Sequence, residues 1–540
     1  MARNVLWLVA AVSVACVGAE DPAELDGDGK GGDGKADASL EAVFLDFEWD
    51  GELTVPGGQD GSWYLNNQTL YTIGHLNGDR SLGRLDKIEV TNTSSTTEGG
   101  VTHFRYHAKM PVAWGKKNAV PTTYTLRLPL DASSAGLERF TESYKEDCVD
   151  WGAHDVDAGS MWYYYRPNAS GCHIAEADLV TSTVTVTPST LQTTGRYPEY
   201  DEVWEDDVLR AVAIFGKNES GATSTSDAGI SAFNQFVRTT KSMLSGATLT
   251  TVPANVSNNP GPGTTDVTFT ATLVDGRRIE VVALLVDSIR ETNAAFDARY
   301  ATLTETADMI SYAGHSGLGA NVRALARKGR WVAGQYVVVL MNGCDSYAYV
   351  DKALWSAHAA VHPGDTTGTK HVDILMNAMP AFFSSNASNV RTLIESLLNR
   401  DTPKTYEQIF GGFDSSQVVL VSGEEDNDYV PGGGGGGEGE GEGEWEGLDE
   451  SGTVARAAEQ RFETPPLAAG HYVFEMTGTK DADLYVRIGT APTTSLYDCR
   501  PYKSNSTESC RVDLPTQSPI HVMVRGYASS STYHLVGHPE

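Results

Sequence analysis

The sequence is poor in basic residues, with 40 Lys and Arg against 71 Asp and Glu and a formal net charge of −31. Nucleic-acid phosphates would be repelled by such a chain, so this charge balance argues against a nucleic-acid partner. Long apolar runs are also scarce. After residue 17 none is long enough to cross a bilayer, so no transmembrane helix is expected. These properties are typical of a soluble, exported protein.

Cysteine is rare as well, with 6 in 540 residues. Two pairs lie close together in sequence within β-rich stretches: Cys148 with Cys172, and Cys499 with Cys510. Two local disulfides are therefore expected in an oxidising compartment. Because Cys16 lies in the leader, Cys344 remains as the one unpaired thiol. An exported protein usually avoids a spare thiol unless that thiol has a use.

The N-terminus predicts export. A short basic start precedes an apolar run, Val5 to Val17, which has the length of a secretory signal rather than of a membrane anchor. Small residues permit cleavage after Ala19, whereas the tetrapeptide ending at Cys16 resembles a lipoprotein box and would carry lipid on that cysteine. Free secretion and lipid attachment at the cell surface both stay open. The Gly- and Asp-rich stretch that follows has little to bury, which indicates a flexible tether.

Two apolar runs of strand length dominate the middle of the chain. Met309 to Ala313 and Tyr336 to Met341 are separated by about one helix, which predicts a strand–helix–strand crossover in a parallel sheet. Each run ends on a small-residue turn, with His315 in the first turn and Cys344 in the second. Parallel pairing of the two strands would bring both side chains to the carboxyl edge, where open α/β sheets place their sites.

A cysteine beside a histidine can lose its proton to the imidazole, and the thiolate that results is a nucleophile for acyl transfer. The structural alternative is that Cys344 is a small core residue and His315 a turn histidine with satisfied hydrogen bonds. Their matching positions at two strand ends favour the catalytic interpretation.

Both turns resemble those of the caspase-like (clan CD) cysteine peptidases, the group that includes gingipain, clostripain, legumain, separase and the CHAT-domain proteases. The matching segments are Tyr312-Ala313-Gly314-His315 and Asn342-Gly343-Cys344-Asp345. The resemblance implies that Cys344 is the nucleophile, that His315 accepts its proton, and that N–H groups of Ser316 and Cys344 hold the oxyanion. It requires no metal or cofactor, and calcium as a structural ion is compatible with it. The family has glycine where this chain has Ser316.

The pattern of residues 40–205 predicts β structure. Short alternating runs between Gly, Asn, Asp and Ser clusters predict an antiparallel β-sandwich, and Met161 to Tyr165 is interpreted as a buried aromatic strand. His154, Asp155 and Asp157 have the alternate spacing of calcium ligands. A turn closed by aspartate side chains is favoured instead, because the glycine and glutamate positions of a calcium loop are missing.

The end of the chain is β-rich again and follows a Gly/Glu-rich stretch that cannot pack. Asp481-Ala482-Asp483-Leu484-Tyr485-Val486 and its neighbours resemble the bacterial pre-peptidase C-terminal (PPC) domain, a small β-sandwich appended to secreted peptidases. The predicted division is therefore a signal peptide at 1–19, a tether at 20–39, an N-terminal β domain at 40–205, a caspase-like, mostly parallel α/β domain at 206–430, a linker at 431–450 and a PPC-like β-sandwich at 451–540.

Taken together, these features predict an exported bacterial cysteine endopeptidase that acts on proteins or peptides. The alternative is a catalytically inactive caspase-like surface protein whose β domains bind a polymer or a partner protein. Three acidic residues, Asp345, Asp373 and Glu424, are candidates for a pocket that receives a basic substrate residue. The acidic run that begins at Glu424 is interpreted first as a solvated surface.

Overall fold

The computed structural model describes residues 37–539 except 191, 366, 425, 426, 428, 432–444, 446, 466, 468, 469 and 515–517. The described residues up to 431 form one unit, and those from 445 onward form a second. The predicted signal peptide, Cys16, most of the tether and most of the linker lie outside the described residues. Within the described part of the chain, no helix is both long and apolar enough to cross a membrane.

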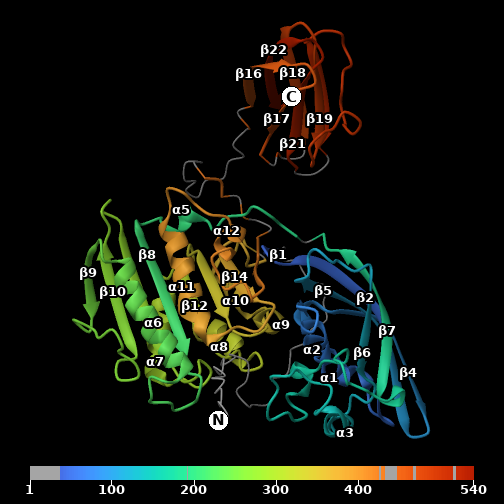
Figure 1. Ribbon diagram of the computed structural model, residues 1–540, viewed down its shortest axis with the longest axis vertical. Coiled ribbons are helices and arrows are strands. Elements are labelled where there is room, and N and C mark those ends of the chain that lie inside the picture. Colours follow the sequence, from blue (N-terminus) through green and yellow to red (C-terminus); the bar gives the residue numbers. More distant parts are fainter. Residues whose placement is uncertain are drawn as a thin grey trace, which may run out of the picture. The chain divides into compact units, whose positions relative to one another are not determined.

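The first unit contains a nine-stranded mixed sheet with the order β1-β15-β14-β13-β12-β8-β11-β10-β9 (Figure 1). The central strands from β14 through β13, β12 and β8 to β11 run parallel, and the outer strands join antiparallel. The strand bounds are β1 Asp37–Ser39, β8 Val208–Gly216, β9 Thr248–Val252, β10 Asp266–Thr272, β11 Arg278–Val286, β12 Met309–Ala313, β13 Val337–Asn342, β14 Val372–Asn377 and β15 Val419–Ser422.

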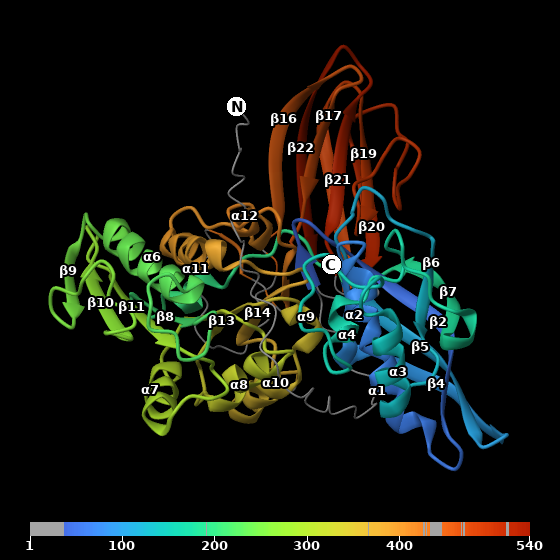
Figure 2. The same ribbon diagram turned by 60° about the horizontal axis from the view of Figure 1, so that its bottom comes forward.

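Helices pack on both faces of this sheet, which explains why its central strands are apolar along their whole length. Figure 2 shows α6 and α11 on one side and α7, α8 and α10 on the other. The helix bounds are α5 Tyr200–Val203, α6 Ala228–Met243, α7 Ala294–Thr304, α8 Ala320–Lys328, α9 Ser346–Tyr349, α10 Ala353–Val361, α11 Phe383–Leu398 and α12 Tyr406–Phe410. The two strands predicted from Met309 to Ala313 and from Tyr336 to Met341 are confirmed as β12 and β13.

The N-terminal part of the first unit is one antiparallel sheet in the order β3-β5-β2-β7-β6, with β4 also paired to β5. The predicted β-sandwich is wrong here, because helices take the place of a second sheet. Its α2 helix is buried along its whole length and shares a core with the strands. The bounds are β2 Val43–Pro56, β3 Ser81–Gly83, β4 Glu89–Glu98, β5 Val101–Trp114, β6 Thr123–Pro129, β7 Leu179–Pro188, α1 Leu65–Thr69, α2 Tyr71–Asn77, α3 Ser134–Tyr144 and α4 Met161–Tyr164.

The aromatic stretch of this region is buried, as expected, but Met161–Tyr164 form the short helix α4 rather than a strand. Just before it, Asp157 Oδ1 accepts the N–H of Ser160 at 2.9 Å. The turn closed by an aspartate side chain is therefore confirmed, while His154 and Asp155 point into solvent.

Residues at the end of the predicted tether belong to the fold. Asp37–Ser39 form β1 and pair antiparallel with β15, with Asp37 opposite Ser422. Without β1, the backbone groups along that side of β15 would form an open sheet edge. Ala38 is fully buried, so the tether ends before residue 37.

The second unit consists of two antiparallel sheets, β16-β22-β18-β20 and β17-β21-β19, which enclose a core of their own. This is the predicted small β-sandwich. Both predicted disulfides are present in the protein, Cys148–Cys172 in the first unit and Cys499–Cys510 in the second. The strand bounds are β16 Leu448–Ala455, β17 Glu459–Glu463, β18 Gly470–Thr479, β19 Ala482–Ile488, β20 Glu508–Leu514, β21 Ile520–Gly526 and β22 Ser530–Pro539.

Candidate active site

The parallel register of β12 and β13 aligns the two predicted catalytic residues. Met309 lies opposite Val338 and Ala313 opposite Asn342, and every pair joins residues 29 positions apart, as His315 and Cys344 are. Two contacts continue this register beyond the strands. The Gly314 N–H donates to the Asn342 carbonyl at 3.3 Å, and Ser316 Oγ donates to the Cys344 carbonyl at 2.6 Å. The crossover therefore brings the two turns together at the carboxyl edge of the sheet.

The imidazole of His315 is held in one orientation. Its Nε2 lies 2.9 Å from the backbone carbonyl of Asn218. A carbonyl oxygen only accepts hydrogen bonds, so Nε2 carries the proton in the neutral ring and Nδ1 has the lone pair. Nδ1 is buried and has no hydrogen-bond partner among the described residues. The ring thus presents an unprotonated nitrogen that is ready to accept a proton.

The loop that carries the Asn218 carbonyl is itself fixed by one carboxylate. Asp227 caps the N-terminus of α6 by accepting the Ile230 N–H, and it also accepts the N–H groups of Asn218 and Glu219 at 3.1 and 2.8 Å. Sequence reasoning did not identify this contact with the histidine. A backbone carbonyl has no residue-type signature, so the sequence alone gave no signal for it.

Close packing explains the glycines of both turns. A Cβ on Gly343 would lie 2.4 Å from Ser316 Oγ, and one on Gly314 would lie 3.0 Å from the Cα of Gly216. A larger residue at either position would require its neighbours to move. Small residues therefore let the His315 and Cys344 turns approach each other and the end of β8.

Cys344 is fully buried, and the N–H of Ala381 donates to its Sγ at 3.2 Å. The ring of Phe383, two residues further along, contacts His315 edge-on with centroids 5.1 Å apart. The segment between β14 and α11 thus forms a common wall for the sulfur and the imidazole.

The prediction that Cys344 is an unpaired thiol is wrong for the state described, because Cys344 is disulfide-bonded. The other four described cysteines pair with one another, so its partner lies outside the described residues. The catalytic hypothesis therefore concerns the reduced form of Cys344.

Asp345 does not line a pocket. Its carboxylate is fully buried against the N-terminal part of the unit, and burial raises its pKa to about 7 although the charge of Arg166 lowers it. The residue has a left-handed backbone, with φ +51, at the start of α9. A buried carboxylate without a partner is costly when ionised.

The other two acidic candidates lie far from the site. Asp373 begins β14 and Glu424 follows β15, so both stand at the edge of the sheet opposite His315. Tyr336 donates its hydroxyl to Asp373 at 2.5 Å, and Tyr406 donates to the same carboxylate. Burial and then the charge of Asp373 hold the pKa of Glu424 well above its usual range. The predicted basic-residue pocket is therefore wrong for these two residues.

This buried pair predicts a pH dependence of stability. Glu424 binds its proton more tightly in the folded than in the unfolded chain, so the folded state loses stability as pH rises above the unfolded value of about 4.3. The loss is at most about 1.4 kcal/mol per pH unit. Glu424→Gln should flatten this fall, as measured by urea unfolding between pH 5 and 8. The exposed residue Glu138 provides the control, Glu138→Gln, which should behave as wild type. Equal slopes in all three proteins would contradict the assignment.

The described part of the chain contains no group of three His, Cys, Asp or Glu side chains placed to hold a metal ion. His154, Asp155 and Asp157 belong to the part of the chain to which this statement applies, whereas Glu425, Asp426 and Asp428 lie outside the described residues.

Comparison with known families identifies one part of the chain. Residues 461–526 match the model of the bacterial pre-peptidase C-terminal domain, which confirms the predicted PPC resemblance. This segment covers β17 to β21 of the second unit.

The curated relatives match through the same C-terminal segment. A zinc metalloprotease of Helicobacter pylori is 41% identical over 78 residues, which are 14% of this chain and 30% of that protein. Alkaline serine exoprotease A of Vibrio alginolyticus is 44% identical over 54 residues, or 10% of each chain. The "Solution structure of vEP C-ter 100" is 36% identical and covers 15% of this chain and 83% of that one, with a TM-score of 0.14. The chain thus spans less than a third of either curated relative.

Proposed function

We propose that this chain is an exported cysteine endopeptidase in which Cys344 is the nucleophile and His315 the general base. The observation that carries the proposal is the orientation of His315. Its Nε2–H is tied to the Asn218 carbonyl and its lone-pair nitrogen is left without a partner, in a turn that the sheet register aligns with Cys344. This is the arrangement that a thiol needs to lose its proton to an imidazole.

The reaction follows the chemistry of thiolate nucleophiles. In the reduced protein, His315 Nδ1 takes the proton of Cys344, and the thiolate attacks the carbonyl carbon of a peptide bond. The carbon–nitrogen bond then breaks as the imidazolium returns its proton to the leaving amine. Water attacks the resulting thioester with His315 again as the base, which releases the acid and restores the thiol.

The oxyanion that forms during both attacks needs hydrogen-bond donors. The backbone N–H groups of Ser316 and Cys344 are the proposed donors. Ser316 contributes in a second way, because its buried hydroxyl donates to the Cys344 carbonyl and so locks the two turns together. A serine in place of the family's glycine therefore has a structural role here and still provides an N–H group.

The C-terminal domain supports a proteolytic role, since it matches proteases in this region. It does not select the catalytic class, because the proteins that share it include one named a zinc metalloprotease and one named a serine exoprotease. The class assignment rests on His315 and Cys344. Export and a protein or peptide substrate are part of the same proposal.

Alkylation of Cys344 by iodoacetamide tests the proposal. The protein is first treated with a reductant, and labelling is followed from pH 5 to 9 by mass spectrometry of the Cys344 peptide. A thiolate paired with His315 reacts quickly at neutral pH, so His315→Ala should slow labelling at pH 6 to 7 by about tenfold or more. The exposed residue His173 offers a matched control, and His173→Ala should label as wild type.

Slow labelling that is equal in wild type and His315→Ala would refute the peptidase assignment. The chain would then be a caspase-like scaffold whose β-rich parts bind a polymer or a partner protein.

A further inference from the structure

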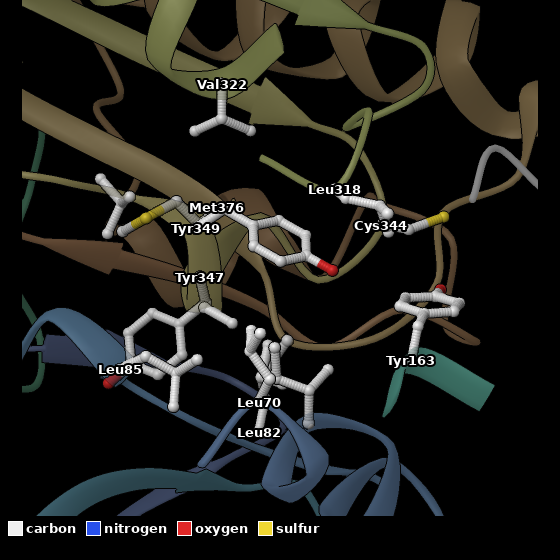
Figure 3. Close-up of a cluster of buried hydrophobic side chains, with 14 of the residues drawn as sticks. Leu70, Leu82, Leu85, Tyr163, Leu318, Val322, Cys344, Tyr347, Tyr349 and Met376 are labelled. Carbon is white, nitrogen blue, oxygen red and sulfur yellow. The ribbon is translucent and has the colours of Figure 1, made fainter. Parts of the chain in front are cut away.

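The proposed nucleophile is covered by another part of the same unit. Cys344 has no exposed surface. Figure 3 shows Tyr163, from α4, beside the Cys344 sulfur, with Leu318 and Tyr349 in the same buried cluster. A peptide carbonyl cannot reach the sulfur while these side chains stay in place. Tyr163 lies within the loop that the Cys148–Cys172 disulfide closes.

We propose that this loop, the covering segment of residues 149–166, is an inhibitory cover that opens when Asp345 loses its proton. The inference rests on the proposed function, because a cover matters only if Cys344 is the nucleophile. It concerns access to the site rather than the chemistry there.

The covering segment is held on the site by packing and few polar contacts. Trp162 stacks edge-on against Tyr349 with centroids 6.4 Å apart. On its other side, α2 lies so close that a Cβ on Gly74 would be 2.5 Å from the Trp162 carbonyl. The hydroxyl of Tyr349 is buried without a hydrogen-bond partner in the described residues. Unsatisfied buried polar groups weaken such a contact.

Asp345 stands at the centre of this weak contact. Both of its carboxylate oxygens are buried, and their interactions with the side chains of Asn77 and Tyr163 are too weak to offset this burial. The polar groups that face it are Asn77 of α2, Tyr163 of α4, Arg166 after α4 and Tyr349 of α9. These groups compensate the buried carboxylate only in part, since burial is the largest influence on its pKa.

The groups nearest to Asp345 also make contacts with other residues. Asn77 donates its amide to the Ser81 carbonyl at 3.4 Å. Arg166 donates to the Gly74 carbonyl at 2.6 Å and pairs with Asp150 at 3.3 Å. Arg323, which faces Tyr349 from α8, makes no hydrogen bond with its terminal nitrogens in the described structure. Asp345 therefore has a nearby positive charge but no ion pair.

The direction of the pH effect follows from burial. Burial raises the pKa of Asp345 to about 7 in the covered state, whereas a hydrated aspartate in the open state titrates near 3.9. Between these values the covered state holds a proton that the open state has lost, so each rise in pH favours opening. Opening should increase by at most about tenfold per pH unit over this window and level off once Asp345 is also ionised in the covered state.

Hydrogen exchange of the covering segment tests the inference without relying on Cys344 chemistry. Three of its amides are protected inside the segment, those of Asp150, Met161 and Arg166. Exchange of the 149–166 peptide is measured by mass spectrometry from pH 5 to 8, corrected for intrinsic rates and compared with a peptide from β2. In wild type, we expect the corrected opening constant to rise by about tenfold or more from pH 5 to 7, while β2 stays constant.

Variants make the test specific. Asp345→Asn should remove the pH dependence of the covering segment, and Tyr163→Ala should open the segment at every pH. Asp155→Asn is the matched control, since Asp155 lies in the same segment with a fully solvated carboxylate, and it should keep the wild-type slope. A wild-type opening constant that does not change with pH, or an unchanged slope in Asp345→Asn, would overturn the inference.

The two proposals fail in different ways. If the covering segment opens as the pH rises but His315→Ala does not alter alkylation of Cys344, the cover is supported and the peptidase assignment is refuted. If alkylation of Cys344 depends on His315, but hydrogen exchange of the covering segment depends neither on pH nor on Asp345, the Cys344–His315 pair is supported and the pH-controlled cover is refuted.

Discussion

Hydrolysis of casein by the reduced protein is expected to fall to background in Cys344→Ala and by about 10²- to 10⁴-fold in His315→Ala. Without the sulfur no acyl-enzyme forms. Without the imidazole, the thiol must ionise unaided and the leaving amine departs without a proton. Because the two groups act as one unit, the double variant should be no slower than Cys344→Ala alone.

The measurement is the initial rate of peptide release at neutral pH, with and without a reductant. Hydrolysis is expected only with the reductant. Cys344 is disulfide-bonded in the state described, and a sulfur in a disulfide cannot act as the nucleophile. His173→Ala serves as the control for histidine replacement, and circular dichroism confirms that each variant is folded. Full activity in Cys344→Ala would exclude this residue as the nucleophile.

Much of the α/β sheet follows from the sequence because its strands are continuous apolar runs. β8, β12 and β13 are buried on both faces, so they contain hardly any polar residues and stand out from the helices between them. The Asp275-Gly276 turn also predicts the β10–β11 hairpin, since this dipeptide favours tight turns. These signals are local, and tertiary contacts agree with them.

The N-terminal region shows where such signals fail. Met161–Tyr164 are methionine and aromatic residues, and aromatic residues favour strands, yet they form α4 because their side chains must fill the space between α2 and the Cys344 turn. The burial of Asp345 was equally hidden. Nothing in an acidic residue after a turn indicates that a segment nearly two hundred positions earlier will cover it.

Sequence reasoning identified the two candidate side chains, Cys344 and His315, but not the groups that orient His315. The contact from the Asn218 carbonyl to His315 depends on a backbone atom, and the Asp227 side chain that fixes it looks like an ordinary helix cap. The sequence analysis also left Cys344 as a free thiol, whereas this residue is disulfide-bonded. Candidate residues were thus predictable from type and spacing, whereas their protonation and access were not.

Arg84→Met is expected to destabilise the first unit by about 3 to 5 kcal/mol. Arg84 is completely buried between the N-terminal sheet and the edge of the α/β sheet. Its Nε lies 2.6 Å from Asp86, and its Nη1 lies 3.8 Å from Asp37. The guanidinium also stacks over the Tyr347 ring at 5.2 Å. Methionine fills much of the volume but leaves two carboxylates without their cation.

The size of this loss of stability depends on the Asp37 and Asp86 carboxylates, which lose their positively charged neighbour. Burial already raises the pKa of Asp37, and the Arg84 charge is the largest influence that lowers it. Removal of the cation forces the carboxylate to take up a proton or remain ionised in a dry environment, and both cost free energy. A second change, Asp86→Leu, should therefore recover part of the loss, because it removes one of the two stranded charges.

Urea unfolding followed by tryptophan fluorescence measures this loss, since all described tryptophans except Trp445 lie in the first unit. The matched control is Arg139→Met, which breaks an exposed pair with Asp131 and should cost less than about 1 kcal/mol. Equal losses in Arg84→Met and Arg139→Met would show that the buried cation is dispensable. A large loss that Asp86→Leu partly reverses would establish that Arg84 joins the two halves of this unit by neutralising buried charge. The contact between the N-terminal part and the α/β sheet would then be most stable beside β1 and β15. The segment over Cys344 would be its less stable part.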